Sequence, residues 1–228
     1  DENFNGAVVI PYVITDGNGG TDSANENITV TPINDTPNIV DDIASTDEDM
    51  VVIIDVLNND SDVDGTIDPT SVTIATLPTN GTVTIDPVTG EVTYTPDADF
   101  NGTDTFEYNV CDNGTPVLCD TATVTVTIAS VNDAPVAVDD DYTVDEDASV
   151  VLTPLDLDTD LDGDTLTIQS IGGTTLTPGT PQTIAVTNGT ITTNAAGEIT
   201  FTPDENFNGA VVIPYVITDG NGGTDSAN

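Results

Sequence analysis

The strongest constraint on the fold is a repeat within the sequence. The segment INDTP, which ends at Pro37, returns as VNDAP ending at Pro135, 98 positions further along the chain. Residues 1–25 are also identical to residues 204–228. Repetition of this kind is typical of a tandem array. We therefore expect three parts: residues 1–32 as the last two strands of a truncated repeat, residues 33–130 as a complete repeat, and residues 131–228 as a repeat lacking its last strand.

Each repeat has the pattern of short strands. Thr and Val are abundant, and apolar residues alternate with polar ones, which favours β structure. In the complete repeat we expect strands at residues 38–43, 50–57, 70–77, 81–86, 90–95, 104–111 and 117–129. The pairs Asn80-Gly81, Thr89-Gly90 and Asn113-Gly114 mark turns between them. Seven short strands in a unit of this size predict an all-β fold of tandem Ig-like β-sandwich domains.

The other two parts follow the same pattern. In the last repeat we expect strands at Tyr142–Val144, Val150–Pro154, Leu166–Ile171, Ile184–Asn188, Gly189–Thr193, Glu198–Thr202 and Val211–Thr218. In the first part we expect a hairpin of Ala7–Thr15 and Thr21–Thr31. A lone hairpin is marginal in water, so it should be loosely ordered or packed against another copy. The open edge of the last repeat is predicted to accept residues 26–31 (ENITVT) of a neighbouring molecule, unless the chain is a cut from a continuous fibre.

The charge of the chain excludes several partners. There are 41 Asp and Glu residues and no Lys, Arg or His, which gives a formal net charge of −41. Nucleic acid and anionic membrane surfaces are therefore excluded as expected partners, because both are bound through Lys and Arg. The apolar runs fall short of the roughly 20 residues that a membrane helix needs, so we expect no direct membrane insertion.

The carboxylates gather in runs rather than spreading evenly. Between Asp133 and Asp164 there are twelve carboxylates and no base. Two carboxylates about 4 Å apart repel by roughly 1 kcal/mol even in water, so a cation from solution must neutralise such a cluster. Calcium takes six to eight oxygen ligands in flexible geometry, whereas magnesium keeps more water and zinc prefers His and Cys. The alternative is a solvated acidic surface, which is our interpretation for scattered acids such as Asp86, Glu91 and Glu198.

Alternating strand directions place these acids at two domain junctions. One junction should gather the loop after the first strand and the linker of one repeat with the D-x-D-x-D-G run of the next. The other junction should gather the corresponding residues at the start of the complete repeat. The candidate Ca²⁺ ligands are Asp35, Asp41, Asp47, Glu48, Asp49, Asp60, Asp62, Asp64, Asp97, Asp99, Asp112, Asn132, Asp133, Asp139, Asp158, Asp160, Asp162, Asp164 and Asp219.

Cys111 and Cys119 are the two cysteines of the chain. They flank a turn-like insert, DNGTPVL, between two expected strands. A disulfide across this hairpin is the favoured interpretation, and it implies an oxidising compartment. Two buried free thiols, or a metal site without histidine, are the alternatives.

These motifs together resemble the bacterial cadherin-like tandem-95 repeats of giant surface adhesins. The resemblance rests on the linkers INDTP and VNDAP, the runs NNDSDVDGT and DTDLDGDTLT, and the segments YTPDADFNGTDTFEYNV and FTPDENFNGAVVIPYVITDGNGGTDSA. It covers essentially the whole chain, and it implies cadherin-like domains in an extended array with calcium at the junctions. A gliding-type adhesin of the Bacteroidetes is a source that it points to. The first run lacks the fourth aspartate found at Asp164, so the first junction is expected to bind fewer or weaker ions.

Four sequences in which Asp and then Ser or Thr precede Ala, Val, Ile, Leu or Met match an O-glycosylation pattern found in such adhesins. The hydroxyl residues are Ser23, Thr121, Thr165 and Ser226. Short motifs of this kind also arise by chance in a chain rich in Asp and Thr. The Asn-x-Thr sequences at Asn80, Asn101 and Asn188 are weaker, because Asn-Gly-Thr also favours turns.

The sequence favours a structural function. We expect stalk repeats of a secreted adhesin or fibre on a bacterial cell surface, made rigid by calcium and contacting neighbouring repeats of the same chain or fibre. A carbohydrate- or ligand-binding module is the alternative, but Trp is absent and the Phe and Tyr residues occupy repeat-equivalent positions typical of a core. An enzyme is not expected, because the chain has no His, Lys or Arg to build common catalytic groups.

Overall fold

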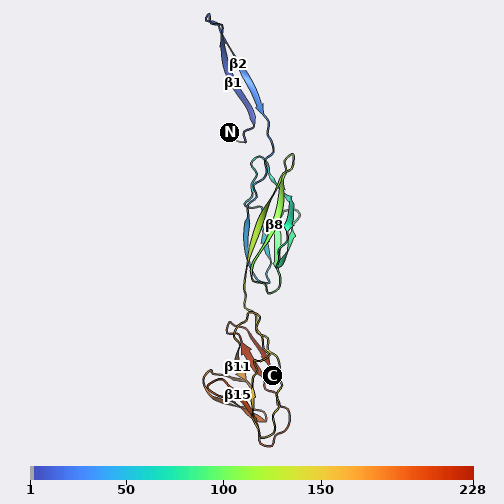
Figure 1. Ribbon diagram of the computed structural model, residues 1–228, viewed down its shortest axis with the longest axis vertical. Helices are drawn as coiled ribbons and strands as arrows, with labels where there is room; N and C mark the ends of the chain where they lie inside the picture. Colours follow the sequence, from blue (N-terminus) through green and yellow to red (C-terminus); the bar gives the residue numbers. More distant parts are fainter. Residues whose placement is uncertain (1–2) are drawn as a thin grey trace. The chain divides into compact units, whose positions relative to one another are not determined.

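The computed structural model describes residues 3–228, and within this range it contains strands and no helix (Figure 1). The all-β prediction is therefore confirmed. The chain separates into two compact units, unit 1 up to Val131 and unit 2 from Asn132 onward.

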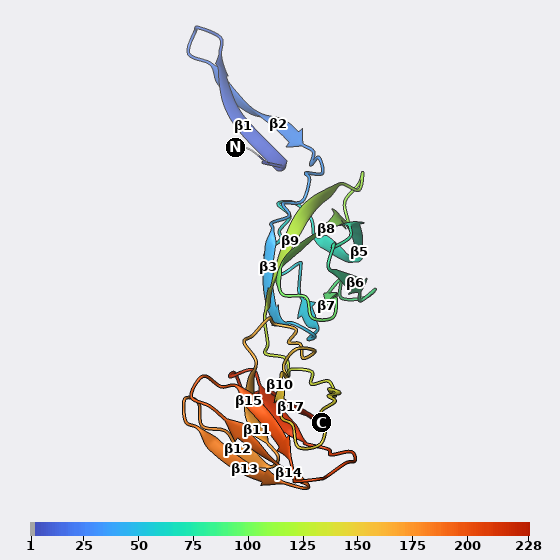
Figure 2. The same cartoon turned by 60° about the horizontal axis from the view of Figure 1, so that its bottom comes forward.

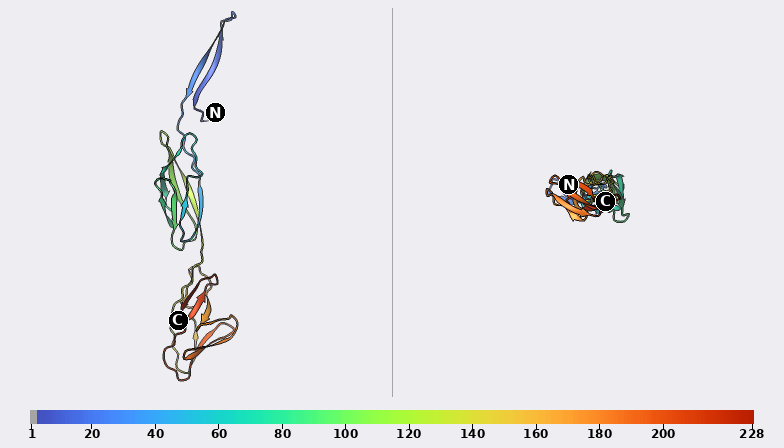
Figure 3. Two further views of the ribbon diagram at one scale, coloured as in Figure 1. Left: turned by 180° about the vertical axis from the view of Figure 1, so that it is seen from behind. Right: turned by 90° about the horizontal axis from the view of Figure 1, so that it is seen from below.

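Unit 1 begins with an isolated β-hairpin. Strands β1 (Gly6–Thr15) and β2 (Thr21–Val30) pair antiparallel, from Gly6 opposite Val30 to Thr15 opposite Thr21, as the sequence predicted. Figure 3 shows the two strands, in blue, from behind. They form a two-stranded sheet of their own. The apolar side chains of this hairpin stay exposed: Val13 is 69% exposed and Ile14 58%.

The rest of unit 1 is a sandwich of two sheets. One sheet has the order β3 (Asp42–Asp47), β9 (Cys119–Ala129), β8 (Gly102–Asp112) and β5 (Ile67–Thr76). The other has the order β4 (Val52–Ile54), β7 (Val92–Pro96) and β6 (Gly81–Ile85). Figure 2 shows the two sheets around a common interior.

Alternation along the strands builds the core of unit 1. Val83 lies opposite Tyr94, and Ile85 lies opposite Val92, so these apolar side chains share one face. On β8 the same period buries every second residue, including Phe106 and Tyr108. Burying a large apolar side chain contributes roughly 1.5–3 kcal/mol. Phe106 and Tyr108 are therefore core, as predicted.

The first strand of the sandwich differs from the prediction. The sequence placed it at residues 38–43, but β3 runs from Asp42 to Asp47. Asn38 instead makes an isolated bridge with Ser61. Strand β3 begins only where the chain reaches β9, with which it pairs parallel from Asp42 opposite Val124. A long-range partner, which local periodicity does not reveal, sets this boundary.

Unit 2 is a second sandwich with two four-stranded sheets. One has the order β10 (Val150–Leu152), β15 (Ile199–Pro203), β14 (Gly189–Thr193) and β13 (Gln182–Val186). The other has the order β12 (Thr174–Thr175), β11 (Thr167–Ile171), β16 (Tyr215–Thr218) and β17 (Thr224–Ala227). Ile171, Ile191 and Ile217 are fully buried between the sheets.

Two predicted strands of unit 2 are absent or shortened. Residues 142–144 are not a strand, and the strand predicted at 211–218 begins only at Tyr215. In unit 1 the equivalent segments are both paired with β9. Within the described residues, the corresponding strand of unit 2 is β17, which covers only Thr224–Ala227. Both segments of unit 2 therefore have fewer residues to pair with than β3 and β8 have in unit 1, which explains the absent strand and the shortened one.

The predicted disulfide is present. Cys111 and Cys119 are bonded, with an S–S distance of 2.01 Å, and they face each other across β8 and β9. In unit 2 the facing pair at the corresponding hairpin is Thr218 and Thr224. The bond therefore closes the loop of one repeat and has no counterpart in the other among the described residues.

Removing the disulfide is expected to destabilise unit 1 modestly. Replacing both cysteines by threonine, the pair that unit 2 uses, should lower the free energy of unfolding by about 2–3 kcal/mol, because the closed loop is short. Urea unfolding with and without dithiothreitol measures this. The reductant should shift the wild type and leave the variant unchanged. An equal response of both proteins would contradict the prediction.

Candidate metal centre

The D-x-D-x-D-G turn of unit 2 brings three carboxylates together. Asp160, Asp162 and Asp164 offer oxygen atoms that lie within 4.8 Å of one another. The bridge between Val136 and Thr159 anchors the start of the turn, and Gly163 takes a positive φ of 77° that glycine tolerates best. A hydrogen bond within the turn closes it: the Asp164 amide donates to Asp160 Oδ1 at 3.1 Å.

Two further segments of unit 2 join this turn. The amide of Asp133, in the linker, donates to Asp162 Oδ2 at 2.8 Å. Asn221 donates through Nδ2 to Asp164 Oδ2 at 2.6 Å. The linker, the aspartate turn and the loop between β16 and β17 therefore meet at one end of unit 2.

Asp219 fixes the third of these segments. Its side chain accepts from Asn132 Nδ2 at 2.8 Å and from the backbone amides of Asn221, Gly222 and Gly223. The Asn132 bond, followed by the amides, holds the pKa of Asp219 below its ordinary value, although burial acts in the opposite direction. This carboxylate therefore stays ionised and ties the linker to the loop.

Unit 1 repeats the arrangement at its own linker. Asn34 Nδ2 donates to Asp112 Oδ2 at 2.5 Å, as Asn132 does to Asp219. The Asp35 amide donates to Asp64 Oδ1 at 3.3 Å, as Asp133 does to Asp162. Thr66 occupies the place of Asp164, so this end has one carboxylate fewer.

The packing of the unit 1 linker explains the glycine in its loop. A Cβ atom at Gly114 would meet Asn34 Oδ1 at 1.7 Å. Only glycine leaves room for the asparagine that holds Asp112. The Leu118 amide is the main cause that keeps the pKa of Asp112 low, and Asn34 and the Gly114 amide add to it.

Each aspartate turn also contains a buried oxygen with no hydrogen-bond partner. Among the described residues, three side-chain atoms are of this kind: Asp42 Oδ2, Asp62 Oδ2 and Asp160 Oδ2. Asp62 and Asp160 are the same position of the two repeats, 98 residues apart. A buried carboxylate oxygen costs free energy unless a donor or a cation satisfies it. The same unsatisfied oxygen therefore recurs at the equivalent position of both units.

The first aspartate of each acidic run accepts hydrogen bonds from its own domain. Asp60 Oδ1 accepts from the Val40 amide, and Asp158 Oδ1 accepts from the Val138 amide, both at 2.8 Å. A buried tyrosine hydroxyl donates to each of them, Tyr108 in unit 1 and Tyr215 in unit 2, at 3.1 Å. Burial raises the pKa of Asp60 above its usual range.

A second acidic residue lies close to each of these tyrosines: Asp42 beside Tyr108 and Asp140 beside Tyr215. Burial raises the pKa of Asp42 to about 6, and the Tyr108 hydroxyl acts against that rise. Burial, followed by the charge of Asp158, raises the pKa of Asp140 in unit 2. Asp42 and Asp140 were not predicted as site residues. Protonation of Asp42 would remove the negative charge from this buried carboxyl group, whose Oδ2 has no hydrogen-bond partner.

Two further predicted ligands, Asp41 and Asp139, accept backbone hydrogen bonds within their own unit. Asp41 Oδ1 accepts from the Thr123 amide at 2.9 Å, and Asp139 Oδ1 accepts from the Asn228 amide at 2.9 Å. The partner of Asp41 thus lies in β9, and the partner of Asp139 lies directly after β17.

The opposite end of the unit 1 sandwich gathers a separate acidic group. Glu48 is only 4% exposed and accepts from the Val131 amide at 2.5 Å and from Asn101 Nδ2 at 3.3 Å. Asp49 Oδ1 accepts from the Asp99 amide at 3.2 Å. Asp47 ends β3, and Asp97 follows β7. The sequence reasoning missed the asparagines Asn34 and Asn101, although Asn34 is the repeat partner of the predicted Asn132.

Taken together, the two sandwiches and their acidic ends define a class of tandem immunoglobulin-like domains. The family model described as bacterial Ig domain matches residues 34–127 and 132–228. The chain therefore belongs to the bacterial Ig domain family.

Solved structures with a similar fold are cadherin repeats. Protocadherin gamma C5 EC1-3 has 15% identity and a TM-score of 0.51, over 97% of this chain and 76% of that one. Mouse clustered PcdhgC3 EC1-3 has 15% identity and a TM-score of 0.50, over 99% and 76%. The protocadherin gammaB7 EC3-6 cis-dimer has 15% identity and a TM-score of 0.53, over 100% and 59%. Identity this low supports the fold alone, and it agrees with the predicted cadherin-like sandwich.

A search of curated proteins found no match. Within residues 3–228, no helix is long and apolar enough to cross a membrane.

Proposed function

We propose that the chain is a set of structural repeats from an extracellular bacterial surface adhesin or fibre, and that calcium bound at the domain ends makes the repeats rigid. The observation that carries this is the buried, unpartnered oxygen at equivalent positions of both aspartate turns, Asp62 Oδ2 and Asp160 Oδ2. Nothing in the chain can neutralise these turns, because it contains no Lys, Arg or His.

The donor set fits calcium. In unit 2 the turn offers carboxylates from Asp160, Asp162 and Asp164, which lie close enough to share one ion. Calcium accepts several carboxylate oxygens at 2.3–2.6 Å in irregular geometry. Zinc is disfavoured because the two sulfur atoms are joined in a disulfide and there is no histidine. The equivalent positions in unit 1 are Asp62, Asp64 and Thr66, so the turn there offers two carboxylates.

A mechanical role follows if the acidic ends of successive repeats share ions. We propose that Asp47, Glu48, Asp49, Asp97 and Asp99 complete the coordination at the junction that follows residue 130. The ion then replaces repulsion between two anionic ends by attraction to a common cation. The partners proposed are therefore neighbouring repeats of the same chain or fibre, with the boundaries 1–32, 33–130 and 131–228.

Surface modification belongs to the same proposal. Ser23, Thr121, Thr165 and Ser226 all have exposed positions, which attachment of a glycan requires. An extracellular location is supported by the disulfide, because such bonds persist in oxidising environments. We propose no catalytic activity for these repeats.

Calcium titration of matched variants tests the ion site. In isothermal titration calorimetry at pH 7, wild type is expected to bind calcium, and Asp160→Asn should weaken the unit 2 site at least about tenfold, or 1.4 kcal/mol. Asparagine keeps the Oδ1 acceptor for the Asp164 amide, so the turn should stay folded. Asp62→Asn should act in the same way on the unit 1 site.

The control is Asp86→Asn, which removes the same charge from an exposed hairpin turn. It should leave the titration unchanged. Equal losses in the control and in Asp160→Asn would indicate nonspecific attraction to a negative surface. That result, or no binding at millimolar calcium, would contradict the proposal.

A further inference from the structure

Two acidic side chains and a tyrosine meet inside the unit 1 sandwich. Asp42 is the first residue of β3 and is 9% exposed, and Tyr108 is fully buried on β8. The Tyr108 hydroxyl donates to Asp60 Oδ2 at 3.1 Å. Burial, followed by the charges of Asp42 and Asp60, raises the pKa of Tyr108, so both carboxylates lie close to this hydroxyl. The fold thus brings two negative charges to one buried hydroxyl group.

The Tyr108 hydroxyl does not satisfy both carboxylates. A tyrosine hydroxyl has one hydrogen to donate. The Val56 carbonyl oxygen, 2.7 Å from the hydroxyl oxygen, competes with Asp60 for that hydrogen. While the hydrogen is shared between these two acceptors, none is left for Asp42 Oδ2.

The side-chain amide of Asn59 is also engaged elsewhere. It lies near Asp42, but its Nδ2 donates to the carbonyls of Val40 and Asp41, at 3.2 and 3.1 Å. These two bonds use both hydrogens of the amide group. Asp42 Oδ2 is therefore buried without a hydrogen-bond partner, and the chain has no Lys, Arg or His to neutralise it.

Asp104 and Tyr94 form a second buried aspartate–tyrosine pair in unit 1, and there the carboxylate is fully satisfied. Three backbone amides donate to Asp104. Burial acts to raise the pKa of Asp104, but the amides and Tyr94 outweigh it and leave this pKa below its ordinary value. Burial, with a contribution from the charge of Asp60, instead raises the pKa of Asp42 to about 6. The fold therefore provides donors for one buried pair and not for the other.

A cation between Asp42 and Asp60 would replace their repulsion by attraction to a common charge. Repulsion between carboxylates grows as the surroundings become less polar, so it is stronger here than at the surface. A calcium ion lies about 2.3–2.6 Å from its oxygen ligands, closer than a hydrogen-bonded water at about 2.7–2.8 Å. An ion can therefore reach an oxygen atom that water does not.

We propose that Asp42 and Asp60 bind a divalent cation inside unit 1, with the Tyr108 hydroxyl oxygen as a further ligand. The hydroxyl can keep its hydrogen bond to the Val56 carbonyl and offer a lone pair to the ion. Calcium fits best, because all of these ligands are oxygen atoms and two of the groups are charged. The site is separate from the aspartate turn of this unit, and it acts on the stability of the domain rather than on a junction.

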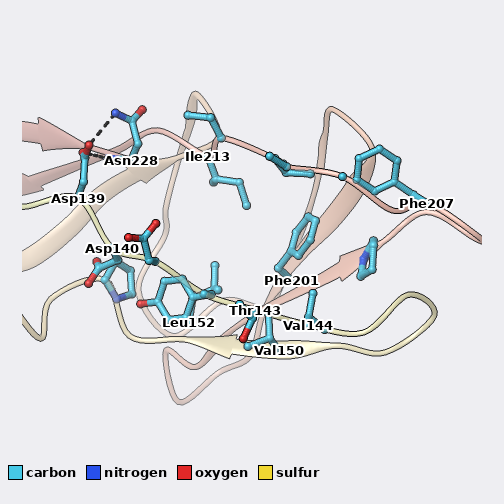
Figure 4. A pocket seen from close by; sticks show the side chains of 18 of the residues that line it. Asp139, Asp140, Thr143, Val144, Val150, Leu152, Phe201, Phe207, Ile213 and Asn228 are labelled. Atoms are coloured by element: carbon cyan, nitrogen blue, oxygen red, sulfur yellow. Dashed lines mark hydrogen bonds between the residues drawn. The ribbon is translucent and has the colours of Figure 1, made fainter.

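Unit 2 repeats the same three residue types. Asp140 and Asp158 lie 98 positions after the two acids of unit 1. The Tyr215 hydroxyl lies 3.1 Å from Asp158 Oδ1 and 3.5 Å from Asp140 Oδ2. Figure 4 shows the side chain of Asp140 next to that of Asp139. The recurrence of two acids around one tyrosine hydroxyl supports a common ligand in the two repeats.

Terbium luminescence tests the site, because tyrosine transfers excitation energy efficiently only to a terbium ion close to it. The chain has five tyrosines and no tryptophan. In a Tyr215→Phe background, which removes the corresponding signal of unit 2, excitation of tyrosine should give terbium emission, and calcium should suppress it by competition. Tyr108→Phe should remove most of this emission. The matched control is Tyr94→Phe, whose hydroxyl bonds the satisfied Asp104, and it should leave the emission unchanged.

Two aspartate variants separate this site from the aspartate turn. Asp42→Asn should weaken terbium binding, as measured through Tyr108, at least about tenfold, or 1.4 kcal/mol. Asp62→Asn, in the aspartate turn, should leave that affinity unchanged. Failure of the proposed site at the domain end is therefore distinguishable from failure of this one.

Urea unfolding of Asp42→Asn in calcium and in chelator gives a measurement that does not depend on luminescence. In chelator the variant should be more stable than wild type, because the repulsion with Asp60 is removed. In calcium the order should reverse, because only the wild type gains the ion. If a proton neutralises Asp42 instead, calcium should not change the difference between the two proteins. That result, or tyrosine-sensitised emission that survives Tyr108→Phe, would overturn the proposal.

Discussion

Calcium is expected to raise the melting temperature of the chain by about 10–20 °C relative to a chelated sample. At a calcium concentration one hundred times the dissociation constant, one site adds about 2.7 kcal/mol to the free energy of unfolding. For domains of this size, 1 kcal/mol shifts the melting temperature by about 4–8 °C. The effect is large because the ion satisfies oxygens such as Asp160 Oδ2, which have no partner in the protein. Differential scanning calorimetry at pH 7 measures it.

Sodium chloride distinguishes this effect from simple screening. At 1 M salt the screening length falls to about 3 Å, so repulsion among surface carboxylates is largely removed. If the acids are only a solvated surface, salt and calcium should stabilise the chain to the same extent. If the aspartate turns bind ions, millimolar calcium should exceed molar salt, and Asp160→Asn should lose part of the gain.

Replacing Asp104 by alanine is expected to destabilise unit 1 by about 3–5 kcal/mol, because buried donors lose a charged acceptor. Asp104 is 4% exposed. It accepts from the amides of Thr79, Asn80 and Thr105 and from the Tyr94 hydroxyl, at 2.8–3.1 Å. Val211 occupies this position in unit 2, so only the unit 1 transition should move.

The same group sets a pH dependence. Burial alone would raise the pKa of Asp104, but the amides of Asn80 and Thr79, with Tyr94, outweigh it and leave the pKa below its ordinary value. A carboxylate with a lowered folded pKa contributes stability that is present above its unfolded pKa, near 3.8, and is lost as pH falls through the folded value. Urea unfolding between pH 7 and pH 2 should therefore show a smaller difference between wild type and Asp104→Ala at the acid end.

The control for this prediction is Asp86→Ala. Asp86 accepts amide hydrogen bonds from Val88 and Thr89, but its turn is exposed. Its loss should destabilise unit 1 far less than the loss of Asp104, because water replaces the carboxylate at an exposed turn. A cost equal to that of Asp104→Ala would show that the burial of Asp104 is not the cause.

The sequence predicted the features that depend on local pattern. Alternation in GTVTIDPVTGEVTYTP placed Val83 opposite Tyr94, and the turn between Cys111 and Cys119 placed the two sulfur atoms together. The repeat of INDTP and VNDAP also indicated that the same contacts would recur in each unit. These inferences need only neighbours along the chain or a comparison of two stretches of it.

Features set by long-range partners were not predictable in this way. The start of β3 depends on β9, about eighty residues later, and the irregular stretch before Tyr215 depends on a strand that the described residues do not supply. The burial of Asp42 and Asp104 was also not predicted, because the sequence contains 41 Asp and Glu residues and does not distinguish these two from the rest. Only burial, which the sequence pattern does not report, separates them from exposed acids.

The backbone of the acidic loops is held by their own side chains. Asp219 alone fastens three consecutive amides, and the linker is tied to the loops through Asn132 and Asp133. Such a site is preorganised, since folding of the domain has already met the entropic cost of arranging the loop. An ion that arrives there would need to displace little more than water, and exchange of Asn132, itself a candidate ligand, would release the linker from Asp219.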